Sequence, residues 1–561
     1  MKDTRNHISV LLICVTCIGI LTAYFSKQEQ RKIADKDNDI VNINLRILAI
    51  NDFHGHIATS SDSYGDVGRA DYLASNIQAA KAGVEHSILV SAGDLIGASP
   101  FVSAFFHDEP TIEAMNMIGL EINSVGNHEF DEGPKELLRM QHGGSHPVDG
   151  DLDGDGFTGA KFEFLAANVI DNASGDTLFP EYSIREYESV KVAFIGMTLE
   201  GTPAVVLPTG VAGLSFNDEV QTVNALVPIL KKQGIESIVV LLHEGGLSDG
   251  EANNCGTGLF GPIADITTAL DDAVDLVIAG HTNDEFICEI DGKWVTMADK
   301  AGRLFTQIDV TLNSQTKDMT VIRIENIANR QKNVTPDPKV TQLIQKYETV
   351  STDIANTVIG TIRGDITKAL NSAGESTLGN VIADSQLAFT AKPTSGEAVV
   401  AFMNEGGIRT DLLYANSRDE ADGEVTYSEV FSVQPFNNNL VTMTLTGTQI
   451  DTLLEQQWLG QIKARILQVS KGFSYTWDNM APVGNKVDPA SIFINGEAIV
   501  LEDSYRVTVN NFIAGGGGGF KVLKEGTDRL VGDIDLKALV AYFENNAVVF
   551  PAPQNRIRRI N

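Results

Sequence analysis

The sequence predicts an α/β protein with two domains, and three observations support this. Short apolar runs rich in β-branched residues alternate with amphipathic helical patterns, which is typical of a layered α/β domain whose strands are buried on both faces. This pattern ends near residue 330, where two prolines follow within residues 333–338. A second mixture of strand-like and helical segments comes next, and a length of 561 residues also favours more than one domain.

The predicted elements follow in order along the chain. In the first domain, strands are expected at 45–50, 88–90, 122–125, 238–242 and 276–279, and helices at 68–81 and 217–232. A helix over 339–349 should join the domains. In the second domain, strands are expected at 399–403, 440–445 and 505–509, and helices at 377–389 and 449–458. The predicted boundaries are therefore 41–330 for the first domain, 331–355 for the linker helix and 356–561 for the second domain.

The charge balance restricts the partners. Asp and Glu number 74 against 42 Lys and Arg, which gives a formal net charge of -32. Such a field repels polyanions, and the sequence has no basic run that could neutralise many phosphates. Long nucleic acids are therefore disfavoured. A small phosphate ester stays compatible, because metal ions or single arginines act locally. Nothing in the sequence implies a protein partner.

Residues 1–40 have the pattern of an export signal followed by a charged linker. Lys2 and Arg5 precede an apolar run over residues 8–25. The run is about long enough to span a bilayer, so an uncleaved membrane anchor is the alternative to a cleaved signal peptide. Either interpretation predicts an extracytoplasmic protein, and the bacterial periplasm is the expected location.

The four cysteines divide into two pairs. Cys14 and Cys17 lie inside the apolar run, where no structural role is expected. Cys255 and Cys288 are the only pair in the folded part, and an oxidising compartment would allow one disulfide between them. Two buried free thiols are the alternative.

One acidic loop resembles a calcium site. Asp151, Asp153 and Asp155 occupy alternate positions, as in a calcium-binding loop, and Gly156 follows. The twelfth position of such a loop should be Glu but is Phe162. A weak Ca²⁺ site and a solvated acidic turn both remain open here.

Five of the predicted strands end in residues that bind metals. In a largely parallel sheet, the carboxyl ends of strands converge on one crevice, so these side chains should meet there. They are Asp52 and His54, Asp94, Asn127 and His128, His243, and His281 and Asn283. Any one of them alone would more simply be a hydrogen-bonded structural residue. Together in one crevice they would be costly to bury without cations, so we predict a metal centre.

The kinds of ligand indicate the chemistry. No Cys is present among them, so hard or borderline divalent ions are favoured over a closed structural zinc site. A shared aspartate can bridge two cations about 3.5–4 Å apart, an arrangement suited to in-line displacement at phosphorus. We therefore expect two divalent ions, with Zn²⁺, Mn²⁺, Co²⁺ and Mg²⁺ as the candidates.

These motifs, D-x-H, G-D, G-N-H-E, H and G-H-x-N in this order, resemble those of the 5′-nucleotidase family of calcineurin-like metallophosphoesterases. The resemblance extends from residue 44 to the end of the chain. It implies that the first domain is a four-layer β-sandwich flanked by helices, and that the second is an α/β domain that binds substrate. It also implies an order of ligands. Asp52, His54 and Asn283 would hold one metal, Asn127, His243 and His281 the second, and Asp94 would bridge them.

The resemblance also implies roles outside the metal centre. His128 would contact the phosphoryl group, with Asp131 as its orienting partner. In the second domain, segments 375–380, 404–409, 434–436 and 511–512 resemble the family's nucleotide-binding motifs. By that resemblance, Phe436 and Phe512 would sandwich the base, Arg409 would bind phosphate and Asn404 would belong to the same pocket. Without the motifs, core packing would explain each Phe and a surface charge would explain Arg409.

Three positions depart from the family pattern. Asn283 stands where relatives usually have His or Gln, and Ser372 where animal ecto-5′-nucleotidases have Arg. Gly518 replaces an Asp that bonds the ribose hydroxyls in relatives. Loss of that acceptor should weaken ribose discrimination by about 1–3 kcal/mol.

Several functions are compatible with this sequence. The leading hypothesis is hydrolysis of nucleoside 5′-monophosphates. The alternatives on the same scaffold are a 2′,3′-cyclic-nucleotide phosphodiesterase with 3′-nucleotidase activity, a hydrolase of nucleotide-sugar or dinucleotide pyrophosphates, and a thiosulfate-ester hydrolase. A nucleotide-binding scavenging protein is the non-enzymatic alternative. The complete metal set and the His128–Asp131 pair argue against it, because binding alone does not need them.

Overall fold

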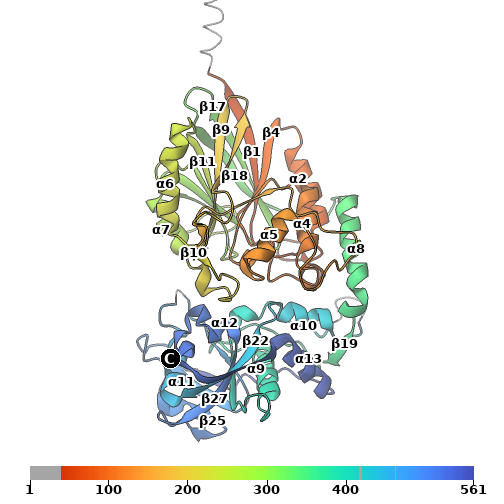
Figure 1. The fold of residues 1–561 in the computed structure, drawn as a ribbon, viewed down its shortest axis with the longest axis vertical. Coiled ribbons are helices and arrows are strands. Elements are labelled where there is room, and N and C mark those ends of the chain that lie inside the picture. The colour runs from red at the N-terminus through yellow and green to blue at the C-terminus, as the bar shows by residue number, and fades with distance from the viewer. Residues whose placement is uncertain (1–39, 416–419, 462) are drawn as a thin grey trace, which may run out of the picture.

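The computed structural model describes residues 40–415, 420–461 and 463–561, which form two domains, one above the other in Figure 1. The predicted export segment, with its apolar run, Cys14 and Cys17, lies outside the described residues. Within the described part, none of the helices combines the length and the apolar character needed to cross a bilayer.

Two six-stranded sheets form the centre of the first domain, with strand orders β18-β17-β1-β4-β5-β6 and β15-β16-β14-β11-β9-β8. The strands of the first sheet are β1 (Asn42–Ile50), β4 (His86–Ser91), β5 (Ile122–Ser124), β6 (Glu163–Leu165), β17 (Leu304–Asn313) and β18 (Met319–Ala328). Those of the second are β8 (Tyr182–Tyr187), β9 (Val190–Thr198), β11 (Ser237–His243), β14 (Leu276–Ala279), β15 (Glu285–Ile290) and β16 (Lys293–Ala298). In each sheet the central strands run parallel.

Strand β1 shows why these apolar runs form strands. Ile47 and Ala49 lie in the core between the two sheets, whereas Leu48 and Ile50 lie in the core under a helix layer. All four side chains are at most 1% exposed. A strand buried on both faces needs apolar residues at every position, which explains the continuous run in the sequence.

Helices cover the outer face of each sheet and complete the four predicted layers (Figure 1). The first sheet is covered by α2 (Ala70–Lys81) and α4 (Glu109–Ile118), against which α8 (Pro338–Ala355) packs from outside. The second sheet is covered by α6 (Glu219–Lys232) and α7 (Pro262–Ala269). The sequence predictions of helices at 68–81 and 217–232 are thus confirmed as α2 and α6.

Helix α8 carries the chain from the first domain to the second (Figure 1). It starts after Asp337, whose carboxylate accepts hydrogen bonds from the backbone N–H groups of residues 339 and 340. Its Lys346 forms ion pairs with Asp153 and Asp155 at 2.5 and 2.8 Å. The acidic loop thus has a positive charge supplied by the protein. The aspartates of this loop do not belong to any group of described side chains whose ligand atoms lie close enough together to hold a metal ion.

The second domain contains a five-stranded sheet, β23-β20-β27-β22-β28, and a four-stranded sheet, β26-β25-β24-β29. The strands are β20 (Val400–Met403), β22 (Asn439–Thr446), β23 (Gln468–Val469), β24 (Phe473–Asp478), β25 (Phe493–Ile494), β26 (Glu497–Ala498), β27 (Ser504–Asn510), β28 (Thr527–Ile534) and β29 (Ile557–Ile560). The helices are α9 (Thr377–Thr390), α10 (Tyr427–Val433), α11 (Gly447–Glu455), α12 (Asn511–Ala514) and α13 (Asp535–Asn545). α10 and α12 lie on the side that faces the first domain (Figure 1).

Cys255 and Cys288 form a disulfide, so the first of the two alternatives for this pair is confirmed. Cys288 belongs to β15, an edge strand of the second sheet, and is 1% exposed. The bond therefore fastens the loop around residue 255 to the sheet edge.

Candidate active site

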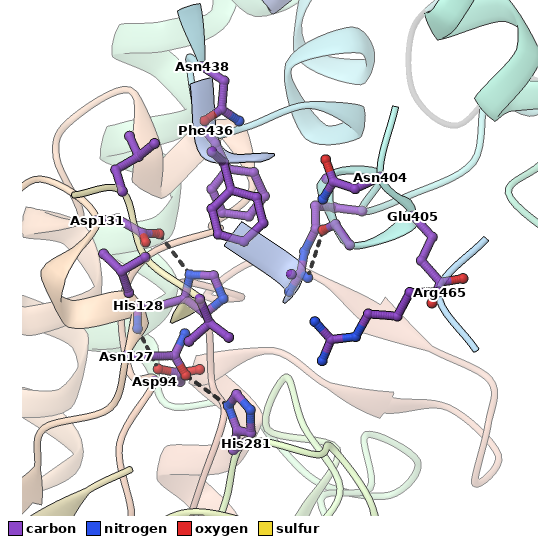
Figure 2. Close-up of a pocket in the computed structure, with 18 of the residues that line it drawn as sticks. Asp94, Asn127, His128, Asp131, His281, Asn404, Glu405, Phe436, Asn438 and Arg465 are labelled. Atoms are coloured by element: carbon purple, nitrogen blue, oxygen red, sulfur yellow. Dashed lines mark hydrogen bonds and ion pairs between the residues drawn. The ribbon is translucent and has the colours of Figure 1, made fainter. Parts of the chain in front are cut away.

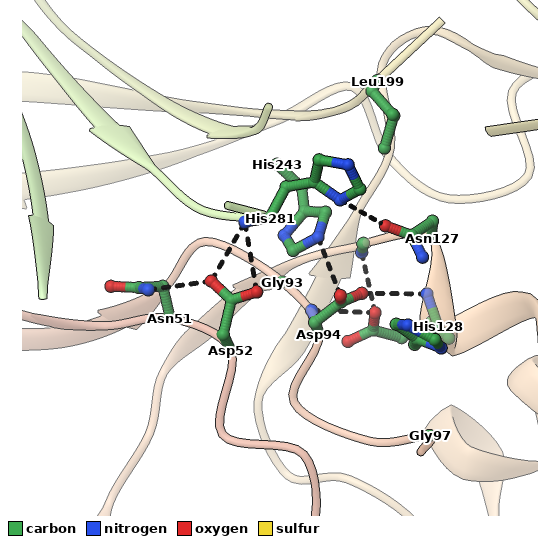
Figure 3. Close-up of polar contacts among 12 residues, drawn as sticks. Asn51, Asp52, Gly93, Asp94, Gly97, Asn127, His128, Leu199, His243 and His281 are labelled. Carbon is green, nitrogen blue, oxygen red and sulfur yellow. Dashed lines mark hydrogen bonds and ion pairs between the residues drawn. The ribbon is translucent and has the colours of Figure 1, made fainter. Parts of the chain in front are cut away.

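The five predicted strand ends meet at the edge of the first domain that faces the second. Asp52 and His54 follow β1, Asp94 follows β4, Asn127 and His128 follow β5, His243 ends β11, and His281 and Asn283 follow β14. Figure 3 shows His243 turned toward Asp94 and His281 turned toward Asn127. The backbone N–H groups of His128 and His281 donate to Asp94 and Asp52. The parallel topology therefore brings together the residues that the sequence singled out.

The backbone at these positions is strained. Five of the predicted ligands have a positive φ: Asp52 (48°), His54 (48°), Asp94 (49°), His281 (76°) and Asn283 (55°). For residues other than Gly, this region is sparsely populated and costs about 1–3 kcal/mol each. Strain gathered on one set of polar side chains indicates that their positions serve a site rather than the stability of the fold.

The side chains form two groups whose ligand atoms lie within 4.8 Å of one another, and Asp94 belongs to both. One group is Asp52, His54 and Asp94, and the other is Asp94, His243 and His281. The Nε2 atoms of His54 and His243 lie 3.7 and 3.0 Å from Asp94 Oδ2. Two similar groups, His107–Glu132–His146 and Glu85–His86–Glu188, include exposed glutamates. In the two groups that contain Asp94, every side chain is buried except His281, which is half-buried.

Asn127 and Asn283 lie next to His281. Asn127 Oδ1 is 2.8 Å from Nδ1 of His281. Asn283 donates its amide to the backbone oxygen of His281 at 3.1 Å, while its Oδ1 is buried without a hydrogen-bond partner. A buried oxygen without a hydrogen-bond partner is rare, and a bound cation would satisfy it.

Neighbouring groups orient the imidazoles and carboxylates. Nδ1 of His243 lies 2.7 Å from the Ala92 oxygen, and Nδ1 of His54 lies 2.9 Å from the Gly97 oxygen. Donation to these oxygens fixes the tautomer that leaves Nε2 unprotonated for a metal. Asn51 and Glu129, which the sequence analysis did not assign a role, contribute as well. Asn51 donates to Asp52 at 2.8 Å, and Glu129 accepts from the backbone N–H of Asp94 at 3.0 Å.

Burial makes uncompensated charge costly in this cluster. It raises the pKa of Asp52 to about 6 and lowers the pKa of His281 to about 3. Burial also opposes protonation of His243, but the Asp94 carboxylate outweighs it and raises the pKa of His243 to about 10. Divalent cations would keep the carboxylates ionised and the imidazoles neutral. The residues present therefore fit two cations.

His128 and Asp131 lie beside this cluster. Asp131 Oδ2 is 2.8 Å from Nδ1 of His128, and the backbone N–H of His128 donates to Asp94 Oδ1 at 2.8 Å. Burial lowers the pKa of His128, but the charges of Asp131 and Asp94 more than offset it, so the pKa lies above its usual value. The imidazole is thus held in a fixed orientation and its charged form is favoured.

A cavity of about 470 Å³ lies over the cluster and is lined by both domains. Figure 2 shows His128 and His281 on one side, with Phe436 and Asn404 of the second domain facing them. All four predicted substrate residues, Asn404, Arg409, Phe436 and Phe512, line this cavity. Asn510 donates to Asn404 Oδ1 at 2.8 Å, and the Arg409 guanidinium lies 5.7 Å from the centre of the Phe436 ring.

The sequence analysis missed other residues of the cavity. Glu405, Asn438, Arg465 and Phe520 also line it, as does the segment 205–207 of the first domain. Glu405 and Asn438 lie inside or beside the motifs already quoted, so their position could have suggested them. Arg465 belongs to none of these motifs.

Comparison with known proteins gives two family matches. Residues 45–284 match the model of calcineurin-like phosphoesterases, and residues 357–525 match the model of the 5′-nucleotidase C-terminal domain. The crystal structure of a 5′-nucleotidase precursor from Thermus thermophilus superposes with a TM-score of 0.75 and 25% identity, covering 92% of this chain and 100% of that one.

Two curated relatives are more similar in sequence. The cell wall protein Lmo0130 of Listeria monocytogenes is 32% identical, over 97% of this chain and 71% of that protein. The endonuclease YhcR of Bacillus subtilis is 34% identical, over 89% of this chain. The match spans only 40% of the length of YhcR.

Proposed function

The chain belongs to the 5′-nucleotidase family of calcineurin-like metallophosphoesterases, and we propose that it hydrolyses nucleoside 5′-monophosphates to nucleoside and phosphate. One observation carries the proposal. The two ligand groups that share Asp94 open into the same cavity as the His128–Asp131 pair, Arg409 and two phenylalanines of the other domain. A metal centre alone would fit many hydrolases, but a metal centre facing an arginine and two aromatic rings fits a nucleotide.

We assign the metal ligands as the sequence motifs suggested. Asp52, His54 and Asn283 would hold one divalent ion, Asn127, His243 and His281 would hold the second, and Asp94 would contact both. Bound there, the ions would activate water as the nucleophile and would neutralise charge on the phosphoryl oxygens. The buried, unpaired Oδ1 of Asn283 supports its inclusion, although Asn is shorter than the usual His or Gln.

The other polar residues act on the phosphate. His128, held in place by Asp131, donates a hydrogen bond to the phosphoryl group and stabilises the negative charge that develops during ester cleavage. Arg409 offers its planar guanidinium to the same phosphate from the second domain.

The second domain holds the nucleoside. Phe436 and Phe512 stack on the two faces of the base, and Asn404, oriented by Asn510, offers polar contacts in the same pocket. Stacking accepts every base, because each has a π-face. We therefore expect broad base specificity.

The departures at Ser372 and Gly518 favour a second candidate class on the same scaffold, namely cyclic nucleotides or nucleotide pyrophosphates. Without an acidic side chain at 518, selection for two free ribose hydroxyls is weakened. A scavenging protein that binds nucleotides without hydrolysis remains the non-enzymatic alternative.

We also propose an extracytoplasmic location, with residues 1–40 acting as a signal peptide or a membrane anchor. The Cys255–Cys288 disulfide supports this, because such bonds persist mainly in oxidising compartments. The Listeria relative is itself named a cell wall protein.

The test is phosphate release by the full chain after metal removal and restoration of Mn²⁺, Zn²⁺, Co²⁺ or Mg²⁺. The substrates are AMP, deoxy-AMP, 3′-AMP, 2′,3′-cyclic AMP, a nucleotide sugar and NAD, with His128→Ala as the blank. Metal-dependent turnover of AMP is expected, with deoxy-AMP nearly equal. A preference for the cyclic or pyrophosphate compounds would refute the substrate assignment but keep the metal mechanism. Binding of AMP without turnover under any metal would favour the scavenging protein.

A further inference from the structure

Arg465 is a second arginine in the cavity, and the proposed reaction does not use it. It lies in the loop before β23 and lines the same cavity as Arg409 and Phe512. Figure 2 shows its guanidinium directed into the cavity. Among the described residues Arg465 forms no ion pair. Burial raises the pKa of Glu405, and the positive charge of Arg465 acts against that shift. An unpaired guanidinium facing a binding cavity is suited to an anionic ligand.

The glycine loop, residues 515–519, lies next to Arg465. A Cβ atom added to Gly518 would lie 3.7 Å from Nη1 of Arg465. The loop that carries Arg465 is tied to the glycine loop, because Gln461 donates a hydrogen bond to the Gly518 oxygen at 2.7 Å. A Cβ atom added to Gly517 would come within 2.5 Å of the Phe512 ring. Arg465 therefore lies beside the loop that supports Phe512.

This position corresponds to the sugar of a bound nucleotide. A sugar links the base to the 5′-phosphate, so a base stacked on Phe512 and a phosphate at the metal centre place the sugar between them. The part of the cavity near Gly518 has no side chain at residue 518 and a guanidinium as its nearest charged group. A guanidinium binds phosphate much more strongly than hydroxyl groups.

We propose that Arg465 and the glycine loop form a second phosphate subsite, which binds a phosphate on the sugar of the nucleotide whose 5′-phosphate is hydrolysed. The inference rests on the proposed function for the placement of the base and the 5′-phosphate. It extends the substrate class to nucleoside bisphosphates phosphorylated at the 2′ or 3′ position. The reaction is unchanged: water breaks the 5′ P–O ester bond, and a nucleoside 2′- or 3′-monophosphate leaves together with inorganic phosphate.

The experiment measures binding and turnover separately. Binding of AMP, adenosine 3′,5′-bisphosphate, adenosine 2′,5′-bisphosphate and ADP is measured by calorimetry on the metal-loaded full chain carrying His128→Ala, and turnover of the same compounds on the chain without that change. A sugar bisphosphate is expected to bind about tenfold or more tightly than AMP. Arg465→Gln should bring this ratio close to one. Lys463→Gln, which removes a charge from the same loop, should leave the ratio unchanged.

Two variants at Gly518 test the charge directly. Its φ of +64° is a conformation that Asp and Asn adopt more readily than other side chains, and no neighbouring atom lies closer than 3.4 Å to the added Cβ. Gly518→Asp places a carboxylate beside Arg465 and should abolish the preference for a bisphosphate. Gly518→Asn has nearly the same size and should largely keep it.

The outcomes separate this inference from the proposed function. An Arg465-dependent preference for a sugar bisphosphate in binding supports the subsite even if AMP is never hydrolysed, in which case only the proposed function fails. Turnover of AMP together with equal binding of AMP and both bisphosphates would overturn the subsite. An Arg465-dependent gain for ADP alone would overturn its assignment to the sugar, because the second phosphate would then belong to a pyrophosphate.

Discussion

The His128 imidazole of the first domain lies nearly parallel to the Phe436 ring of the second, with ring centroids 5.6 Å apart and an interplanar angle of 17°. His54 meets the same imidazole edge-on at 5.1 Å. The proposed catalytic histidine is thus enclosed between a proposed metal ligand and a proposed base-stacking ring. Any movement of one domain against the other therefore changes the surroundings of His128 and the distance between the Phe436 ring and the proposed metal centre.

Replacing Phe436 by Ala should weaken the binding of nucleotides. Loss of one stacking face costs about 1–3 kcal/mol, so KM for AMP should rise about 5- to 150-fold. Ribose 5-phosphate has no base to stack, and its kcat/KM should fall much less. The measurement is steady-state hydrolysis of both substrates by the wild type and the variant.

Phe431 provides a matched control for this experiment. It also lies on the second domain, but it packs in a hydrophobic core against Phe101 rather than lining the cavity. Phe431→Leu should therefore lower stability but leave the ratio of kcat/KM for AMP to kcat/KM for ribose 5-phosphate unchanged. An equal fall in kcat/KM for AMP and ribose 5-phosphate in Phe436→Ala would show that the ring shapes the catalytic site and does not stack on the base.

Metal content should distinguish the shared ligand from an unshared one. Asp94 belongs to both ligand groups, so Asp94→Ala should remove both tightly bound ions, whereas His54→Ala should remove about one of the two. The measurement is metal analysis after dialysis. His142, an exposed histidine outside both groups, is the control, and His142→Ala should keep the wild-type content. Two retained ions in Asp94→Ala would contradict the assignment of Asp94 as the bridging ligand.

The cluster of candidate metal ligands could be predicted as a cluster because two regularities coincide in it. Apolar runs such as 45–50 identify buried strands, and the parallel order places the residues that follow each strand at the same edge. Asp52, Asp94 and His243 could therefore be grouped without knowledge of their distances. The motif order then suggested which ligands belong together.

Contacts between distant loops could not be predicted in this way. Arg465 faces the cavity because Gln461 is hydrogen-bonded to Gly518, 57 positions away. Lys346 pairs with Asp153 across 193 positions, a contact that the acidic pattern of the loop does not indicate. Neither contact leaves a periodicity or a motif in the sequence. Both depend on how separate segments pack.

Removal of the disulfide should lower stability but leave the chemistry intact. Cys255 and Cys288 are 33 positions apart, and closing a loop of that length contributes about 4 kcal/mol in a chain-entropy description. The double variant Cys255→Ala/Cys288→Ala should therefore unfold at a lower temperature in a thermal scan. Added reductant should lower the midpoint of the wild type and leave that of the variant unchanged. A wild-type midpoint that does not respond to complete reduction would refute the stabilising role.

The last prediction concerns pH and Asp275, which directly precedes β14, at the opposite end of that strand from the proposed ligand His281. Asp275 accepts a hydrogen bond from the backbone N–H of Ile238 at 2.8 Å. Burial, followed by the nearby charge of Asp318, raises its pKa from 3.8 to about 8, in spite of this hydrogen bond. Between about pH 4 and pH 8 the folded protein therefore holds a proton that the unfolded chain has lost. Such a difference makes stability fall as the pH rises through this window.

Asp275→Asn removes the titration and keeps an oxygen that can accept the hydrogen bond from Ile238. The unfolding midpoint of the variant, measured against that of the wild type, should therefore increase with pH. The increase between pH 5 and pH 9 should be about 2–6 °C. Thermal scans at both pH values measure the difference. Asp176→Asn is the control, because it makes the same chemical change at an exposed carboxyl group of the same domain. If the difference in unfolding midpoint between Asp275→Asn and the wild type is the same at pH 5 and pH 9, Asp275 is ionised in the folded protein throughout this range.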